Sequence, residues 1–401
     1  MLPLHGFAKR VYGFTSTDQR AVFRLCSPTK VPVHSADVAL VRDANELVRA
    51  QSSGFDAAII ISGSEPPRNG NPTPRRVIQL ATEFDYLADG DILGFHPGSK
   101  RFRTIYRRGS AHNSFLVTER CNHYCLMCSQ PPRDVDDGWI LREIRDALPL
   151  IDKQTRTMGF TGGEPLLDWQ EFIRVLALCR DVLPQTAVHV LSNGRAFAST
   201  EIVDAWAGVR HRNLMVGIPI YSAVDTVHDY VVQAKGAFDE TVLGVLKLKD
   251  RGQRVEIRVV LHAITAPRLL ATSQWLARNL PFVDHVALMG LENTGFAVAN
   301  DHLLWIDPLD YKEQLTQSVE LLSASKVRVS VYNLPRCLLD RSVWPYARQS
   351  ISDWKNAFVA ECARCDEKPK CSGFFTTGRP RYSRGIKAIT GTSAPLNGVP
   401  A

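Results

Sequence analysis

The sequence lacks both a long hydrophobic run and a strong excess of one charge. Its best apolar run, Ala57 to Ile61, is far shorter than the ~18 residues of a membrane-spanning helix. Lysine and arginine outnumber aspartate and glutamate by 48 to 41, a surplus too weak and too dispersed to indicate nucleic-acid binding. The first basic residues follow a short apolar start, which is the wrong order for a secretory signal. We therefore expect a cytoplasmic protein with no nucleic-acid or membrane partner.

The composition also lacks any strong bias. With 45% hydrophobic and 22% charged residues, the chain is not collagen-like, a coiled coil or wholly disordered. Its 401 residues suit one large domain with appendages, or two to three modules.

Cysteine is the residue type that stands out, with nine in the chain. Cys26 and Cys179 are isolated, and we expect both to be small core residues. The other seven form an early group of three and a late group of four: Cys121, Cys125 and Cys128, then Cys337, Cys362, Cys365 and Cys371. In a reducing compartment, clustered cysteines indicate a metal site or catalysis rather than disulfides.

The division of these seven cysteines into a group of three and a group of four has a chemical meaning. A [4Fe–4S] cluster has four iron corners, so four thiolates close it and three leave one iron free for another ligand. The alternative is structural zinc, which takes four closed ligands. In the early group His123 would supply the fourth, and in the late group the Cys-x2-Cys pair is itself a zinc pattern. Spacing alone leaves both interpretations open.

From about residue 113 the sequence alternates β-rich runs with helical patterns. Such repeats predict parallel strands joined by helices, in an open sheet or a full or partial barrel. Six strands are expected: Ser114–Glu119, Arg156–Phe160, Ala187–Leu191, Leu214–Tyr221, Arg254–His262 and Asp284–Met289.

Polar or glycine-rich residues follow these strands at the ends where such sheets bind ligands. Two of these segments, Gly162-Gly163 and Ser192-Asn193-Gly194, could equally be ordinary turns. Their convergence on one edge nevertheless predicts a single active site. In strand order the segments are the early cysteines, Thr161–Pro165, Ser192–Arg195, Tyr221 with Ser222, Arg258 within the fifth strand, and Gly290–Glu292.

Taken together, Cys121-x3-Cys125-x2-Cys128, Gly162-Gly-Glu-Pro165 and the βα repeat resemble the radical S-adenosylmethionine (radical SAM) superfamily over residues 113–295. The resemblance implies a [4Fe–4S] cluster held by Cys121, Cys125 and Cys128, with S-adenosylmethionine on its free iron. Reductive cleavage would then give a 5′-deoxyadenosyl radical that abstracts a substrate hydrogen. The cofactor would carry this chemistry, while the protein orients it.

The resemblance also assigns cofactor-binding residues by position. Gly162, Gly163 and Glu164 would meet the methionine amino group, and Ser192 and Asn193 its carboxylate or the ribose. Tyr221 and Ser222 would lie at the ribose, and Gly290 to Glu292 at the adenine. Two positions depart from the family pattern: Met127 replaces the usual aromatic beside adenine, and Pro219-Ile-Tyr-Ser222 replaces a Ser-x-Asp ending.

The four late cysteines resemble the auxiliary-cluster extension called Twitch, which is related to SPASM. A closer resemblance, to one branch of the superfamily, lies in seven stretches of the sequence. They are Cys121–Pro132, Gly159–Pro165, His189–Arg195, Val231–Phe238, Ile351–Lys355, Gly373–Phe375 and Ser383–Gly385. These stretches resemble the His-Xaa-Ser system radical SAM maturases of the HxsC type. That likeness implies a ribosomally made precursor peptide with His-Xaa-Ser repeats, a partner maturase, and an electron donor such as flavodoxin or ferredoxin.

Residues 1–112 carry no catalytic motif, and we expect an α/β module there, with a helix from Leu40 to Val48. Gly90–Phe95 and Arg101–Arg108 predict a hairpin. The arginines of the second run suit either a peptide-docking edge strand or a solvated face.

The expected architecture is thus an N-terminal α/β module (1–112), a partial (β/α)6 radical SAM barrel (113–300), a cysteine-rich auxiliary-cluster extension (301–385) and a disordered tail (386–401). The leading hypothesis is a peptide maturase with two [4Fe–4S] clusters. The alternatives are a two-cluster radical SAM enzyme acting on a small molecule in cofactor biosynthesis, and a non-catalytic iron–sulfur or zinc protein.

Overall fold

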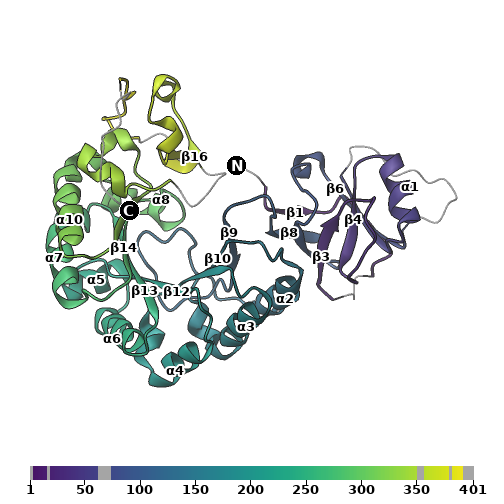
Figure 1. Ribbon diagram of the computed structural model, residues 1–401, viewed down its shortest axis with the longest axis horizontal. Coiled ribbons are helices and arrows are strands. Elements are labelled where there is room, and N and C mark those ends of the chain that lie inside the picture. Colours follow the sequence, from purple (N-terminus) through teal and green to yellow (C-terminus); the bar gives the residue numbers. More distant parts are fainter. Residues whose placement is uncertain (1–2, 16–18, 62–73, 350–355, 379–381, 392–401) are drawn as a thin grey trace.

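The computed structural model describes residues 3–15, 19–61, 74–349, 356–378 and 382–391. Two large sheets lie side by side along the long axis of the molecule, with a smaller C-terminal segment beside the second sheet (Figure 1). No helix in the described ranges is long and apolar enough to span a membrane.

The N-terminal sheet has eight strands and joins its own two ends. In spatial order the strands are β1 (His5–Phe7), β8 (Arg101–Tyr106), β7 (Ile92–His96), β3 (Ala21–Cys26), β4 (Asp37–Val41), β5 (Ala57–Ile61), β6 (Arg76–Leu80) and β2 (Arg10–Tyr12). The outermost strands, β1 and β2, are separated in sequence only by Ala8 and Lys9. Ala8 N–H donates to Lys100 O on the β8 side, and Lys9 N–H donates to Gln79 O in β6. One continuous N-terminal run therefore closes the sheet into a small barrel.

Alternation along these strands gives the barrel two apolar faces. Phe23, Leu25, Ile59, Leu80 and Phe95 belong to the buried core inside it. The opposite face of β4 and β5 packs on helix α1 (Ala44–Ser52), which Asp43 caps by accepting a hydrogen bond from Glu46 N–H. The predicted helix from Leu40 was therefore placed too early, because residues up to Val41 are buried strand.

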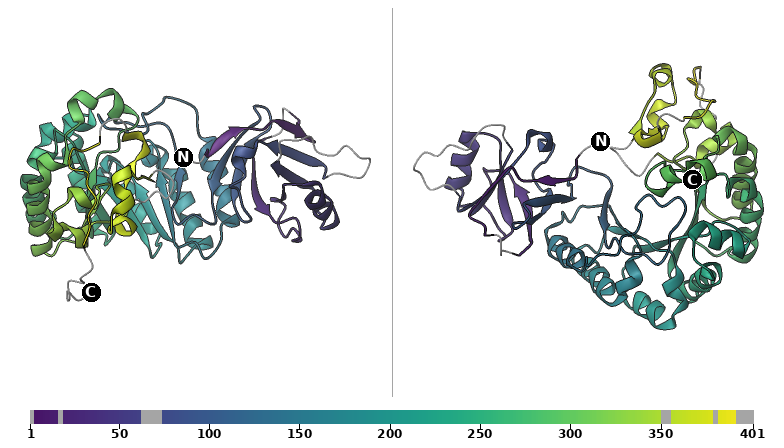
Figure 2. Two further views of the ribbon diagram at one scale, coloured as in Figure 1. Left: turned by 90° about the horizontal axis from the view of Figure 1, so that it is seen from above. Right: turned by 180° about the vertical axis from the view of Figure 1, so that it is seen from behind.

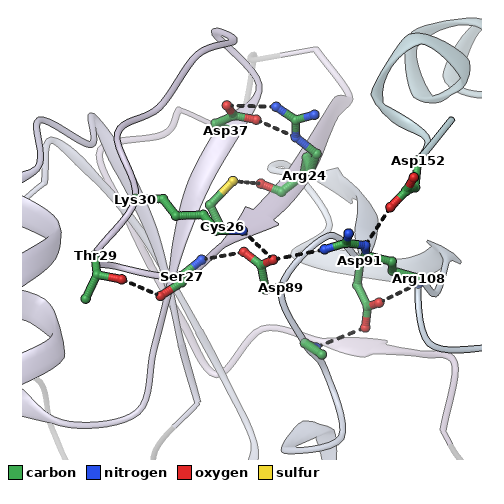
Figure 3. Close-up of polar contacts among 11 residues, drawn as sticks. Arg24, Cys26, Ser27, Thr29, Lys30, Asp37, Asp89, Asp91, Arg108 and Asp152 are labelled. Atoms are coloured by element: carbon green, nitrogen blue, oxygen red, sulfur yellow. Dashed lines mark hydrogen bonds and ion pairs between the residues drawn. The ribbon is translucent and has the colours of Figure 1, made fainter. Parts of the chain in front are cut away.

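The predicted hairpin is confirmed, since β7 and β8 pair antiparallel. The docking-edge interpretation of Arg101–Arg108 is wrong, because β1 covers β8 and closure leaves no free edge there. Two of these arginines instead form ion pairs within the protein. Arg103 forms an ion pair with Glu143. Arg108 forms ion pairs with both Asp89 and Asp152 (Figure 3). The pairs with Glu143 and Asp152 join the module to the segment between the first two strands of the second sheet.

The second sheet has seven strands, all parallel to their neighbours. Their order is β15 (Val329–Tyr332), β14 (His285–Gly290), β13 (Arg254–Leu261), β12 (Leu214–Pro219), β11 (Ala187–Leu191), β10 (Thr157–Thr161) and β9 (Asn113–Leu116). The six predicted strands correspond to β9 to β14, and β15 adds a seventh beyond residue 300. The sheet curves with its helices along the outer side (Figures 1 and 2), and its ends, β9 and β15, do not pair with each other. It is a partial barrel of the expected α/β class.

The helices follow the strands as the sequence indicates. Gly252 has φ +66 and follows α6 (Ala237–Asp250), and Asp168 immediately precedes α3 (Trp169–Val182). In β13, Val255, Ile257 and Val259 face the helices, whereas Glu256 and Arg258 belong to the opposite face. The remaining helices are α2 (Trp139–Ala147), α3 (Trp169–Val182), α4 (Thr200–Gly208), α5 (Asp225–Val232), α6 (Ala237–Asp250), α7 (Leu269–Asn279), α8 (Phe296–Ala299), α9 (Asp301–Leu304) and α10 (Lys312–Ala324).

The C-terminal segment contains 3-10 turns and the short hairpin β16 (Asn356–Ala357) and β17 (Phe374–Phe375). Residues 386–391 belong to this segment, contrary to the expected disordered tail. Asp366 N–H donates to Ile389 O, and Gly391 N–H donates to the Asp366 carboxylate at 2.9 Å. The rest of the predicted tail (392–401) and the stretch 351–355 lie outside the described residues.

Candidate functional site

A cavity of about 280 Å³ lies at the carboxyl ends of the parallel strands, where the sequence predicts an active site. Its wall contains the early cysteines and most of the predicted cofactor-binding residues: Cys121, Cys125, Met127, Cys128, Gly162, Gly163, Ser192, Asn193, Tyr221, Gly290 and Glu292. Glu164 and Ser222 do not line it. The structure thus brings segments spread over more than 170 residues into one place.

The loop from Cys121 to Cys128 is held by hydrogen bonds to the end of α5 and to the region of α8. Tyr124 and Leu126 donate their N–H groups to Val232 O and Val231 O at the end of α5. Asn300 Nδ2 donates to Leu126 O at 2.8 Å, and Phe296 N–H donates to Cys128 O. These contacts present three free thiols to the cavity from one short, anchored loop.

The thiols lie in a setting that disfavours bare negative charge. Burial raises the pKa of Cys121 to about 11 and raises that of Cys125 further. His123 N–H faces Cys121 Sγ at 3.4 Å. A bound cation would reverse this preference, because a coordinated thiol is deprotonated. Three thiols at an apolar wall, with a backbone N–H on sulfur, are a donor set that fits an iron–sulfur cluster.

The His123 ring is buried, and burial lowers its pKa to about 3, so it is neutral. Its Nδ1 lies 4.0 Å from Cys125 Sγ, and its Nε2 has no hydrogen-bond partner. Within the described ranges, no three side chains of His, Cys, Asp or Glu gather closely enough to hold a single metal ion. His123 is therefore a buried, neutral ring beside Cys125.

The glycine pair after β10 is required by the protein's own packing. Gly162 has φ +140, and a Cβ there would lie 2.4 Å from Thr118 O. A Cβ on Gly163 would lie 1.9 Å from Arg120 O. Both glycines let this turn press against the chain that enters the cysteine loop, while their backbone lines the cavity.

Glu164 differs from the expectation that it meets the cofactor's amino group. Its side chain is buried and its carboxylate accepts three hydrogen bonds from the protein. Oε1 accepts from Leu166 N–H at 3.0 Å and from Ser192 Oγ–H at 2.8 Å, and Oε2 accepts from Asn193 N–H at 2.6 Å. Glu164 therefore positions the turn after β11 against the turn after β10.

The turn after β11 is in turn tied to the cysteine loop. Asn193 Nδ2 donates to Asn122 Oδ1 at 2.6 Å, and Ser192 Oγ accepts from Gly194 N–H at 3.1 Å. Glu164, Ser192, Asn193 and Asn122 thus form one chain of hydrogen bonds around the cavity. A change at Glu164 should reach the cysteines through it.

Met127 and Tyr221 belong to one buried apolar cluster beside the cavity. The Tyr221 ring stacks on His228 with centroids 5.7 Å apart. Ser222 does not line the cavity, and its Oγ accepts a hydrogen bond from Val224 N–H at 3.0 Å just before α5. The predicted cofactor contact of Ser222 is thus replaced by a local turn.

The wall also contains Arg258, which the sequence placed at this edge of the sheet, and Met289 and Asn333, to which it assigned no role. Arg258 contacts Met289 Sδ at 3.0 Å and lies 3.5 Å from Glu256. Asn333 follows the unpredicted strand β15 and has φ +62, a conformation that asparagine tolerates better than most residues. Finding Asn333 required knowing that a seventh strand exists.

The late cysteines come together from separate segments. Cys337 lies in a turn after β15, Cys362 and Cys365 lie in and after the turn Ala360–Arg364, and Cys371 precedes β17. Burial raises the pKa of Cys337, and the nearby Cys371 and Cys362 raise it as well. Backbone N–H groups face the sulfurs: Arg336 and Gly373 approach Cys371 Sγ at 3.4 and 3.5 Å, and Ile389 approaches Cys365 Sγ at 3.4 Å. Four thiols with N–H donors suit a closed cluster.

Residues 115–270 match the family model described as "Radical SAM superfamily". This segment runs from β9 into α7 and contains the early cysteines and Gly162–Glu164. The predicted superfamily resemblance is therefore confirmed for that part of the chain. No curated protein sequence matches the chain.

Three solved structures are similar in fold. They are SuiB from Streptococcus suis bound to its precursor peptide SuiA (11% identity, TM-score 0.44, 56% of this chain and 48% of that one), anSMEcpe bound to AdoMet and a peptide (15%, 0.42, 54% and 62%), and a radical SAM methyltransferase from Sphaerobacter thermophilus (14%, 0.43, 62% and 74%). The chain thus spans about half the length of SuiB.

Proposed function

We propose that this protein is a radical SAM enzyme that modifies a ribosomally synthesised peptide carrying His-Xaa-Ser repeats. The observation that supports it best is the cavity itself, where three free thiols of one loop face the glycine turn after β10 and the Ser192-Asn193 turn after β11. The match of residues 115–270 to the radical SAM model covers all of these elements.

In this proposal Cys121, Cys125 and Cys128 hold a [4Fe–4S] cluster with one open iron. The cluster would supply the electron that cleaves S-adenosylmethionine to methionine and a 5′-deoxyadenosyl radical. The chain's own residues bind and orient that molecule. Met127 and Tyr221 offer an apolar surface for its adenosine, and Gly290 to Glu292 lie at the same wall. Gly162, Gly163, Ser192 and Asn193 offer backbone and side-chain polar groups to its methionine end.

The late cysteines would hold a second, auxiliary [4Fe–4S] cluster. Cys337, Cys362, Cys365 and Cys371 supply its four thiolates, and their N–H contacts favour the ionised sulfurs. The proposed partners are the repeat peptide, a second maturase and an electron donor such as flavodoxin or ferredoxin. The peptide assignment rests on the likeness of the quoted motifs to the HxsC-type maturases.

The first experiment measures 5′-deoxyadenosine formed from S-adenosylmethionine by anaerobically reconstituted, reduced protein. We expect the intact protein to form it and Cys125→Ala to form none. Cys26→Ala is the matched control, because that thiol is buried in the N-terminal barrel and should leave cleavage unchanged. Cleavage that persists in Cys125→Ala would contradict the proposal.

A second experiment addresses the substrate. A synthetic peptide of His-Ala-Ser repeats, incubated with the enzyme, S-adenosylmethionine and reductant, should acquire a mass change that Cys125→Ala does not produce. An unchanged peptide, together with turnover of a small metabolite, would favour the alternative of a cofactor-biosynthesis enzyme.

A further inference from the structure

A second pocket, of about 550 Å³, lies at the amino ends of strands β14 and β15, whereas the cavity proposed for S-adenosylmethionine lies at their carboxyl ends. Helix α10, the turn that follows it and the segment 345–348 complete its wall. Among the described residues, none lines both spaces. We call this second space the basal pocket. Its wall includes Ser323, Lys326, Arg328, Pro345, Tyr346 and Arg348.

The basal pocket is lined by three positive charges and no negative one. Lys326 and Arg328 lie in the turn between α10 and β15, and Arg348 follows β15. All three residues are exposed. No Asp or Glu belongs to the wall in the part of the chain that the structure describes. A concave site whose charges have one sign concentrates ions of the opposite sign, here anions.

These three cations are not neutralised by ion pairs. Within the described ranges, no carboxylate forms an ion pair with Lys326, Arg328 or Arg348. Arg348 Nη1 donates instead to two backbone carbonyls, Pro345 O at 2.8 Å and Ala347 O at 3.2 Å. These carbonyl oxygens hold the guanidinium beside the wall and leave its charge in place.

Two carboxylates adjoin the wall through His285, and both are engaged elsewhere. Glu256 Oε2 lies 2.7 Å from His285 Nδ1. Asp284, the residue before His285, forms an ion pair with Lys249 at 2.7 Å. Glu320 belongs to α10 but does not line the pocket. The three cations are therefore available to a ligand.

An anion in the basal pocket is attracted whichever way the exposed side chains turn. The Debye length is about 8 Å at physiological ionic strength, so unit charges around a small pocket act together at its centre. Three cations favour a ligand with two or more negative charges over a single carboxylate. Attraction of this kind also makes binding sensitive to salt.

The volume and the uncharged wall residues indicate a ligand larger than an inorganic ion. Sites for small organic molecules typically measure about 300–1,000 Å³, and the basal pocket falls within that range. Tyr346 contributes a half-buried ring and Pro345 an apolar one. Tyr346 Oη lies 2.8 Å from Ser323 Oγ, a hydrogen bond that holds the ring in place. The wall therefore combines cationic and aromatic groups.

We propose that the basal pocket binds an organic phosphate, that is, a small molecule with a phosphate or diphosphate group. Ionised phosphate oxygens accept hydrogen bonds, and they match the side chains of lysine and arginine, which only donate. Lys326, Arg328 and Arg348 would surround the phosphate charge. Tyr346 and Pro345 would contact the organic part. The proposal does not rest on the radical chemistry, because the pocket lies at the other edge of the sheet.

The test is anaerobic calorimetric titration of the reconstituted protein with adenosine diphosphate, pyrophosphate and adenosine. S-adenosylmethionine is kept at saturation so that its own cavity does not take the adenosine part. We expect one site per chain for adenosine diphosphate and no binding of adenosine. Pyrophosphate should bind about 2- to 10-fold more weakly, because it lacks a ring to contact Tyr346. Raising the salt from about 0.05 M to about 0.3 M should weaken adenosine diphosphate binding several-fold.

Substitutions at one cation separate charge from effects on folding. Arg328→Glu should abolish binding of adenosine diphosphate, whereas Arg328→Lys should retain most of it, because the charge remains. Arg142→Glu is the matched control: Arg142 is an exposed arginine on α2 that does not line the pocket. Its affinity should equal that of the intact protein. Cys125→Ala should also bind adenosine diphosphate normally, so failure of the proposed radical chemistry would leave this result untouched.

Three results would overturn the proposal. The first is no binding of adenosine diphosphate to the intact protein, and the second is an unchanged affinity in Arg328→Glu. The third is pyrophosphate binding as tightly as adenosine diphosphate, which would leave no organic part to recognise. A hexa-aspartate peptide is titrated in parallel. If it displaces adenosine diphosphate and binds more tightly, the pocket is a docking site for an acidic protein and the small-molecule assignment is wrong.

Discussion

The two groups of cysteines present their sulfurs in different ways. The early three occupy one loop of eight residues that is hydrogen-bonded to helices α5 and α8. The late four come from three turns between residues 336 and 371, and a further segment, 386–391, places Ile389 N–H on Cys365 Sγ. The early group is thus set by local sequence on a rigid scaffold, whereas the late group exists only when separate segments meet. Metal binding and folding should be weakly coupled at the first group and strongly coupled at the second.

The largest expected effect comes from removing residues 386–401. Truncation deletes the Ile389 contact with Cys365 and the pairing of Asp366 with Ile389. We expect the protein to lose the second cluster, about four irons of eight. The region after Asp340 should become protease-sensitive while 5′-deoxyadenosine formation persists.

Two comparisons sharpen that result. Truncation after Gly391 should retain about eight irons, because it spares every contact named above, and Cys365→Ala should reproduce the loss. If truncation after Gly385 leaves the iron content unchanged, the late group does not depend on distant segments as we describe.

A smaller effect is expected at the early group from Glu164→Gln. The amide would turn a donor toward Leu166 N–H or Asn193 N–H, which are themselves donors. We expect a stability loss of about 1–3 kcal/mol and weaker S-adenosylmethionine binding, with iron content retained. Equilibrium unfolding and calorimetric titration measure the two quantities.

Ser222→Ala is the control, because it removes a hydroxyl that does not line the cavity, and it should leave S-adenosylmethionine binding unchanged. Equal losses in both variants would contradict the positioning role of Glu164.

We expect a fall in pH to destabilise the surroundings of the early cysteines more than those of the late cysteines. His228 and His262 are buried in the barrel, and burial lowers the pKa of each to about 4. Their Nδ1 atoms accept hydrogen bonds from Tyr221 N–H and Ile264 N–H, which requires the neutral ring. Because the folded pKa lies below the unfolded value of about 6.5, this stability is present above pH 6.5 and is lost as pH falls toward 4.

At pH 4.5 the loss should be on the order of 2–3 kcal/mol for each histidine. Urea unfolding at pH 7.5 and 4.5 measures it, and His228→Gln should reduce the pH dependence. No histidine follows His302, so the late group's segments lack this sensitivity. A pH dependence that is unchanged in His228→Gln would refute the assignment.

The contrast between the groups also shows what the sequence could predict. The cysteine loop, the glycine turn and the Ser192-Asn193 turn follow strands that strong β-patterns reveal, and their common edge follows from parallel topology. Glu164 was misassigned because its partners lie 28 and 29 residues away, at Ser192 and Asn193, and no pattern states which atoms a buried carboxylate meets. The strand β15 (Val329–Tyr332) lies beyond residue 300, where no further barrel strand was expected, and Asn333 was missed with it.

The N-terminal module shows the same limit. Its hairpin was predictable from alternation, but closure of the sheet depends on one run that pairs with β8 and then with β6, far apart in sequence. Arg103 and Arg108 therefore suggested an exposed edge, whereas their partners, Glu143 and Asp152, lie in the next domain. Closure of the sheet and the pairing of the arginines both depend on contacts between residues far apart in the sequence.

The most direct measurement is electron paramagnetic resonance of two reduced variants, with and without S-adenosylmethionine. One lacks Cys337, Cys362, Cys365 and Cys371, and the other lacks Cys121, Cys125 and Cys128. We predict that S-adenosylmethionine shifts the cluster signal of the first variant, whose three thiolates leave one iron open, and leaves the second variant's signal unchanged. An unshifted signal in the first variant, or a shifted one in the second, would contradict the division into an open and a closed cluster.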